Sequence, residues 1–246
     1  MRFENTATQV RPEYQEGVNN RKLVMWVPID ESGENAIPNA VFDSEVFNMW
    51  SYVTHYGNWT APQARMPGNF AEVAHKNGVA VSGVAGTPWN EPAEPGNAWY
   101  AAFTGLADEV GAATVADFLY YYGIDGLGYN SEFNGADATA ALIELHDELV
   151  EEMKGRNPIF ENMWYDGTNE NGVCTFDRGF GSHNDDIMNG ASLFFNYNWS
   201  NRLSSSVEYA RNNGYNPLNI YAGMNMQGAE GNFWTTLITQ PISIGL

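Results

Sequence analysis

The sequence predicts an α/β protein built as a (β/α)8 barrel of the TIM type. Short apolar runs alternate with helix-like stretches, most of these runs are continuously apolar, and each ends in polar or aromatic residues. Continuously apolar strands are typical of a parallel sheet covered on both faces, and alternation with helices produces such a sheet. We divide the chain into an extended, polar N-terminal arm at 1–21 and a barrel domain at 22–246.

Six segments are predicted to be strands. In chain order they are 23–29, 79–85, 126–130, 159–164, 191–197 and 219–224. Residues 241–246 resemble the beginning of a seventh strand. Because a barrel of this type needs eight strands, we expect a barrel that is incomplete at its C-terminus and lacks the last strand or strands.

Helices are predicted between these strands, at 44–55, 69–77, 98–122, 137–153 and 204–213. The segment 137–153 has the clearest pattern, because Leu142, Leu145 and Leu149 recur at helical spacing and form one apolar stripe. The helices at 69–77 and 204–213 are each followed by a glycine, which is a common helix C-cap. The units therefore repeat as strand, loop and helix.

Composition excludes several classes of partner. The chain has 11 Lys and Arg against 30 Asp and Glu, a net charge of −19, which repels nucleic acid and anionic membrane surfaces. No run approaches the roughly 20 apolar residues of a membrane span. Cys174 is the one cysteine, so neither an internal disulfide nor a thiolate cluster is expected, and the four histidines lack metal-site spacing. We therefore expect no metal and no cofactor.

The most informative residues follow the predicted strand at 126–130. Residues 122–132 read Tyr-Gly-Ile-Asp-Gly-Leu-Gly-Tyr-Asn-Ser-Glu, which places Asn130 and Glu132 at the carboxyl end of a buried strand. That end is the catalytic face of a TIM barrel. Strand side chains alternate, so Asn130 and Glu132 are predicted to project together into the barrel mouth.

This Asn-x-Glu ending resembles the catalytic motif of glycoside hydrolase family 85, the endo-β-N-acetylglucosaminidases. Further segments are similar to family blocks in family order: 42–52, 75–79, 164–167, 194–199 and 220–228. The resemblance implies a barrel enzyme that hydrolyses the β-1,4 bond in the diacetylchitobiose core of N-linked glycans. N-glycans or glycoproteins are then the expected partners. We expect a secreted or cell-surface location, although this chain shows no signal peptide.

By this resemblance, Glu132 is the general acid and later the general base. The nucleophile is the 2-acetamido oxygen of the substrate, which forms an oxazoline and makes the reaction a retaining one without an enzyme nucleophile. Asn130 orients the acetamido group, and Tyr165 hydrogen-bonds in the same site. Residues expected to bind substrate are Trp89, Asp166, Phe176, Asn196, Trp199, Asn225 and Gln227, with Phe176 standing where relatives often carry Trp.

The neutral Asn130 cannot raise the pKa of Glu132 by charge repulsion, so we expect burial or a neighbour such as Asp166 to keep Glu132 protonated. Two other functions stay open at this point. One is an ordinary two-carboxylate glycosidase that pairs Glu132 with Asp166 or Glu161. The other is a carbohydrate-binding barrel that performs no chemistry.

Overall fold

The structure is a computed structural model, and it describes residues 21–27, 49–58, 66, 68–87, 92, 97–225 and 234–246. Its centre is a closed barrel of eight parallel strands in chain order. The strands are β1 (Leu23–Val27), β2 (His55–Asn58), β3 (Ala80–Gly86), β4 (Leu127–Asn130), β5 (Asn162–Tyr165), β6 (Ala191–Phe195), β7 (Ile220–Gly223) and β8 (Ser243–Gly245). The predicted (β/α)8 barrel is confirmed.

The expectation that the barrel lacks its last strand or strands is wrong. Strand β8 pairs with β7 and also with β1, through Leu23 opposite Ile244 and Val24 opposite Gly245, and this pairing closes the barrel. The strand missed by sequence analysis is β2, because its first residue was assigned to a helix at 44–55. Within that segment the described residues form turns and the start of the strand. The expected arm at 1–21 lies outside the described residues except for Arg21.

Strand β2 lacks the apolar run by which strands are predicted, because a large side chain of β1 already fills the barrel interior beside it. The ring of Trp26 on β1 extends across the interior, where a methyl group on Gly57 or Gly128 would collide with it. Glycine in a strand often marks such a close approach. With residues 55–58 reading His-Tyr-Gly-Asn, β2 carries no apolar run, and local sequence could not reveal it.

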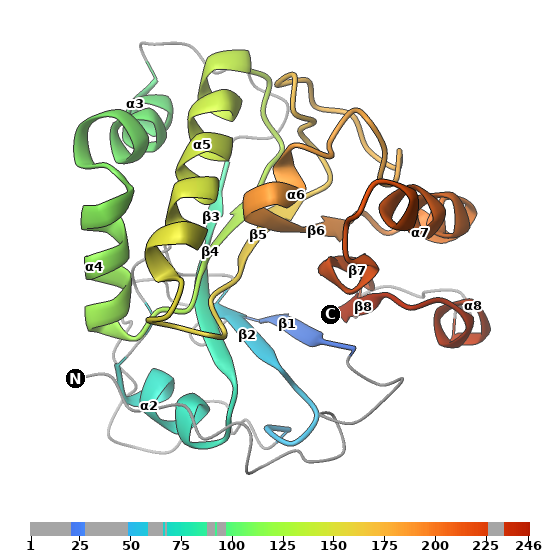
Figure 1. The fold of residues 1–246 in the computed structure, drawn as a ribbon, viewed down its shortest axis with the longest axis horizontal. Helices are drawn as coiled ribbons and strands as arrows, with labels where there is room; N and C mark the ends of the chain where they lie inside the picture. Colours follow the sequence, from blue (N-terminus) through green and yellow to red (C-terminus); the bar gives the residue numbers. More distant parts are fainter. Residues whose placement is uncertain are drawn as a thin grey trace.

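Helices surround the barrel in Figure 1, where α4 and α5 stand side by side and α7 and α8 lie across the barrel from them. The helices are α2 (Gly68–Lys76), α3 (Ala98–Gly105), the π-helix η2 (Leu106–Val110), α4 (Ala112–Tyr122), α5 (Ala136–Met153), α6 (Ile187–Gly190), α7 (Leu203–Asn212) and α8 (Trp234–Thr239), with short 3-10 turns η3 (Trp199–Asn201) and η4 (Pro217–Asn219). The predicted helix at 98–122 is divided, because Gly111 adopts a φ of 77°. The apolar stripe of α5 is buried as expected.

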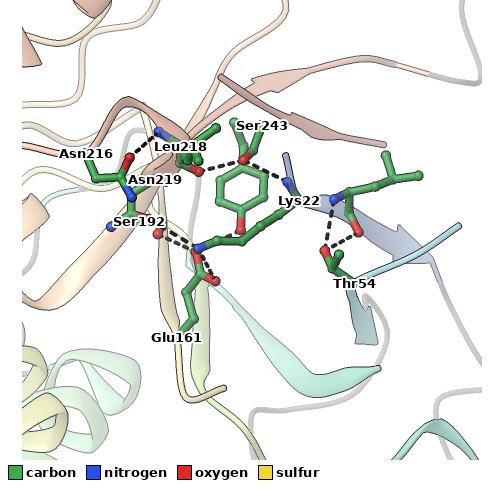
Figure 2. A network of polar contacts seen from close by, with 10 residues as sticks. Lys22, Thr54, Glu161, Ser192, Asn216, Leu218, Asn219 and Ser243 are labelled. Carbon is green, nitrogen blue, oxygen red and sulfur yellow. Dashed lines mark hydrogen bonds and ion pairs between the residues drawn. The ribbon is translucent and has the colours of Figure 1, made fainter. Parts of the chain in front are cut away.

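A polar network closes the amino end of the barrel (Figure 2). Lys22 Nζ lies 2.7 Å from Glu161 Oε2, and the other carboxylate oxygen accepts hydrogen bonds from Ser192 and Tyr221 at 2.5 and 2.8 Å. Burial acts to raise the pKa of Glu161, but Lys22, Ser192 and His55 together hold that pKa below its ordinary value. Glu161 is therefore an ionised group whose hydrogen bonds and ion pair join several strand starts.

A cavity of about 480 Å³ adjoins this network and is lined in part by Lys22, His55, Glu161 and Ser192. These residues stand just before or at the start of strands β1, β2, β5 and β6. The cavity therefore opens at the amino end, which in TIM barrels serves stability, whereas catalytic residues gather at the carboxyl end.

Candidate active site

The candidate site lies where β4, β5 and β6 end at the carboxyl face of the barrel. Asn130 and Tyr165 are the last residues of β4 and β5, and Asn196 directly follows β6. Gly128 pairs with Met163 and Tyr165 pairs with Phe194, so these three parallel strands end at similar heights. Residues 28–48 after β1, 59–65 after β2, most of 88–96 after β3 and 226–233 after β7 lie outside the described residues, so the described part of the site is formed by β4, β5 and β6 with the end of β3.

Asn130 and Glu132 lie on the same side of the chain, as strand alternation predicted. The Asn130 Nδ2 group donates a hydrogen bond of 2.6 Å to Glu132 Oε2. Both side chains are half-buried. An amide and a carboxyl group in direct contact at a barrel mouth can act on one substrate group together.

Two threonines hold the segment that carries Glu132. The Thr87 hydroxyl, at the end of β3, donates to the Asn130 carbonyl at 2.5 Å and accepts from the Glu132 backbone N–H at 3.0 Å. Following β5, the Thr168 hydroxyl accepts from the Phe133 N–H at 3.0 Å, and the Thr168 N–H donates to the Ser131 carbonyl at 2.8 Å. The backbone on both sides of Glu132 is therefore fixed by its two neighbouring strands. Neither threonine belongs to a motif, so sequence reasoning had no signal for them.

Burial is the cause that raises the pKa of Glu132, and the hydrogen bond from Asn130 opposes the rise. Sequence analysis left two causes open for a raised pKa of Glu132, burial or a neighbouring charge such as that of Asp166. Burial is the cause found, without a contribution from Asp166. A raised pKa keeps more of the carboxyl group protonated near neutral pH, which suits a general acid. Burial followed by the charge of Glu132 also raises the pKa of Cys174, a neighbour that sequence analysis did not connect with the site.

Tyr165 belongs to a second polar cluster beside this pair. Its hydroxyl donates to Asn196 Oδ1 at 2.7 Å, and Asn196 Nδ2 donates to Asp177 Oδ1 at 2.8 Å. Burial first, and then Tyr197, Glu132, Asp166 and Asp177, raise the pKa of Tyr165, so the phenol stays protonated. Tyr129 of β4 pairs with Trp164 of β5, so Asn130 and Tyr165, which end these strands, lie at the same height. Asp177 was not identified from the sequence, because it follows no strand and matches no motif.

Asp166 directly follows Tyr165, the last residue of β5. Its side chain is buried, and Asn184 Nδ2 lies 3.4 Å from its Oδ1 atom. Burial and then the charge of Asp177 raise the pKa of Asp166 well above its ordinary value, although Asn184 and the Gly179 backbone act against the rise. This position does not favour the substrate contact expected for Asp166, and a carboxyl group that resists ionisation is a poor nucleophile.

The other residues expected to bind substrate have different positions. Phe176 is half-buried with its ring centroid 6.1 Å from that of Tyr165, so it flanks the site. Asn225 lies just beyond β7 and is half-buried. Trp199 is 2% exposed and its indole N–H donates to the Gly223 carbonyl at 2.7 Å, which does not favour stacking on a sugar. Trp89 and Gln227 lie outside the described residues.

Glu161, the other carboxylate considered as a partner for Glu132, lies at the opposite end of the barrel. It immediately precedes β5, whereas Tyr165 ends that strand. Four residues of strand at about 3.3 Å per residue separate the two ends. Glu161 therefore cannot share a substrate bond with Glu132.

The described part of the chain has neither a metal-binding cluster nor a membrane-spanning helix. There, no cluster of three or more His, Cys, Asp or Glu side chains is arranged to hold a metal ion. None of the described helices combines the length and hydropathy that a membrane span requires.

Comparison with known proteins identifies the family and the fold of the chain. The family model described as glycosyl hydrolase family 85 matches residues 30–243. No curated protein matches the chain significantly. The glycoside hydrolase domain of Endo-D from Streptococcus pneumoniae R6 has a similar structure, with a TM-score of 0.74, 22% identity, and coverage of 92% of this chain and 39% of that chain.

A GH18 chitinase from Pseudoalteromonas aurantia is similar at a TM-score of 0.53 and 11% identity, and the match covers 92% of this chain and 93% of that one. At these identities the structural likenesses show the barrel fold, while the family model rests on sequence and spans most of the chain. The chain therefore belongs to glycosyl hydrolase family 85.

Proposed function

We propose that this barrel is an endo-β-N-acetylglucosaminidase, which cuts the β-1,4 bond of the diacetylchitobiose core of N-linked glycans with the help of the substrate's own acetamido group. The observation that carries the proposal is the contact between Asn130 and Glu132, an amide donating at 2.6 Å to a carboxyl group whose pKa burial raises. Membership of family 85 supports the same activity. N-glycoproteins are then the substrates, and a secreted or cell-surface location follows from where such glycans occur.

In the first step, Glu132 donates its proton to the glycosidic oxygen. The acetamido oxygen attacks the anomeric carbon from the other side, the bond to the leaving sugar breaks, and a protonated oxazoline (oxazolinium) ring forms that keeps the proton of the acetamido N–H. Asn130 orients the acetamido group and stabilises it as charge develops, which is the role of a fixed polar group in a transition state.

In the second step, the Glu132 carboxylate takes a proton from water, and the water oxygen attacks the anomeric carbon. The oxazoline ring opens and restores the acetamido group, and Glu132 regains its proton. Two inversions at the same carbon retain its configuration. No enzyme carboxylate is needed as nucleophile, which agrees with the burial and raised pKa of Asp166 and with the position of Glu161 at the other end of the barrel.

The test is incubation of an N-glycoprotein with the enzyme, followed by mass spectrometry of both products. The proposal expects a protein that keeps one N-acetylglucosamine and a released glycan that carries the other. A glycan left whole on its Asn would instead favour a barrel that binds carbohydrate without cutting it.

Replacing Asn130 with Ala tests the substrate-assisted route. We expect the rate on a glycoprotein to fall about 10²-fold, since a fixed group that stabilises developing charge commonly contributes that much. A pre-formed sugar oxazoline should be processed far better by this variant, because its acetamido group has already reacted. Parallel rates on the two substrates are the measurement, with Asn213→Ala at an exposed position of the same protein as the control. Near-normal cleavage by Asn130→Ala would point to an enzyme nucleophile.

A further inference from the structure

Tyr165, Asn196 and Asp177 form a chain of hydrogen bonds that ends on a carboxylate. Tyr165 Oη lies 2.7 Å from Asn196 Oδ1, and Asn196 Nδ2 lies 2.8 Å from Asp177 Oδ1. The second Asp177 oxygen accepts from Asn198 Nδ2 at 3.1 Å. Asp177 lies in the long connection between β5 and β6, so two strand ends and this connection meet here.

The charge of Asp177 determines the direction of every hydrogen bond in this chain. An ionised carboxylate can only accept, so Asn196 must turn its NH₂ group toward Asp177. The carbonyl oxygen of Asn196 then faces Tyr165, and the phenol has to donate its one proton to that oxygen. With its one proton used, the Tyr165 oxygen can only accept a further hydrogen bond through a lone pair.

We propose that Asp177 is a positioning residue, which acts through Asn196 to make the Tyr165 hydroxyl a hydrogen-bond acceptor toward the substrate. The proposal rests on the proposed function and specifies what the site recognises next to Glu132. The matching substrate group is a donor, either a sugar hydroxyl or the N–H of the acetamido group. A phenol with a free proton could also serve an acceptor group of the substrate, and this chain of hydrogen bonds removes that choice.

The backbone at Asp177 is consistent with such a role. Its φ is 62°, and among the described residues it is the one residue other than glycine with a positive φ. Asp and Asn tolerate this region better than most residues, yet it is seldom occupied without a local requirement. Here the unusual backbone presents the carboxylate to both Asn196 and Asn198.

The first test is kinetic and uses Asp177→Gly, because glycine keeps the positive φ and removes the carboxylate. We expect kcat/KM on a glycoprotein to fall about tenfold, the effect of losing one hydrogen bond to a charged group. Asp177→Asn should lose less, because its amide can hold Asn196 in either orientation. The control is Asn198→Ala, which removes the other hydrogen bond to Asp177 and should stay within about twofold of the wild type, as surface substitutions usually do.

A double-mutant cycle separates positioning from a general effect on stability. In a Tyr165→Phe background, the hydroxyl that Asp177 positions is absent, so adding Asp177→Gly should change kcat/KM little. Losses that simply multiply would overturn the proposal. Melting temperatures of the same four proteins identify any part of the loss that comes from unfolding.

A third measurement needs no substrate. In proton NMR spectra, a hydrogen-bonded Tyr165 hydroxyl should give a resonance that disappears in Tyr165→Phe. We expect the same resonance to be lost in Asp177→Gly and kept in Asn198→Ala, whereas its persistence in Asp177→Gly would contradict the proposal. This signal does not depend on turnover. A wild-type protein that leaves glycans whole would therefore overturn the proposed function, whereas the NMR spectra would still decide whether Asp177 positions the Tyr165 hydroxyl.

Discussion

Replacing Glu132 with Gln is expected to lower kcat/KM on an N-glycoprotein by about 10³, within the range that general acid–base catalysis contributes. Gln has nearly the same shape and still offers an oxygen to Asn130 Nδ2, which now donates to Glu132 at 2.6 Å. Thr87 contacts only the backbone of Glu132, so the loop should keep its position. The variant therefore removes the transferable proton and little else. Initial rates of glycan release, measured by mass spectrometry, give the comparison.

The matched control is Glu161→Gln, the same substitution at the opposite end of the barrel. It removes the charge that pairs with Lys22 at 2.7 Å, and so it should lower stability while leaving activity per folded molecule near that of the wild type. Equal losses of activity in the two variants would refute the assignment of Glu132. The pH profile adds a second reading, because burial raises the pKa of Glu132 and extends the acid form toward neutral pH. The basic limb that reports this group should vanish in Glu132→Gln.

Acid should destabilise the fold in part through His146, and this part of the loss should be absent in His146→Leu. This histidine lies on the buried face of α5, packed between the rings of Tyr129 and Trp164. Within the described part of the chain, neither of its ring nitrogens has a hydrogen-bond partner. A charged imidazole there would lack both water and an ion-pair partner, so burial lowers the pKa of His146 to about 3 from 6.5.

Below pH 6.5 the unfolded chain binds a proton at His146 that the folded protein cannot bind. The stability due to its neutral form is therefore complete above pH 6.5 and is lost as pH falls toward 3. At about 1.4 kcal/mol per pH unit, the loss is on the order of 5 kcal/mol at the acid end. Urea unfolding of the wild type and His146→Leu between pH 7 and pH 4 measures it, since leucine has no titrating group.

Val150→Ala provides the control for this series, because Val150 is an exposed, non-titrating position on the same helix. Its effect on the free energy of unfolding should be the same at every pH. If the wild type and His146→Leu also gave parallel curves, His146 would not be the group that responds to acid.

The sequence showed the site better than it showed the barrel around it. Asn130 and Glu132 were placed on one side of the chain by the two-residue period of a strand, and their hydrogen bond bears this out. Burial of Glu132 was one of the two causes expected to raise its pKa. For Asp166 and Trp199 the expected substrate contact stays a prediction, because each follows a strand end closely, as expected, but has a buried side chain.

By itself the sequence determined the alternation of strands and helices, the carboxyl ends at which polar residues gather, and the resemblance to the family, because each depends on local periodicity or contiguous motifs. Only the tertiary structure decided that β2 exists and that β8 closes the barrel by pairing with β1. In β2, the ring of Trp26 occupies the space beside Gly57, so a glycine is required there. The tertiary structure also decided that Glu161 lies at the far end and that Asp177 reaches Asn196. Such relations join residues distant in the chain, and periodicity carries no information about them.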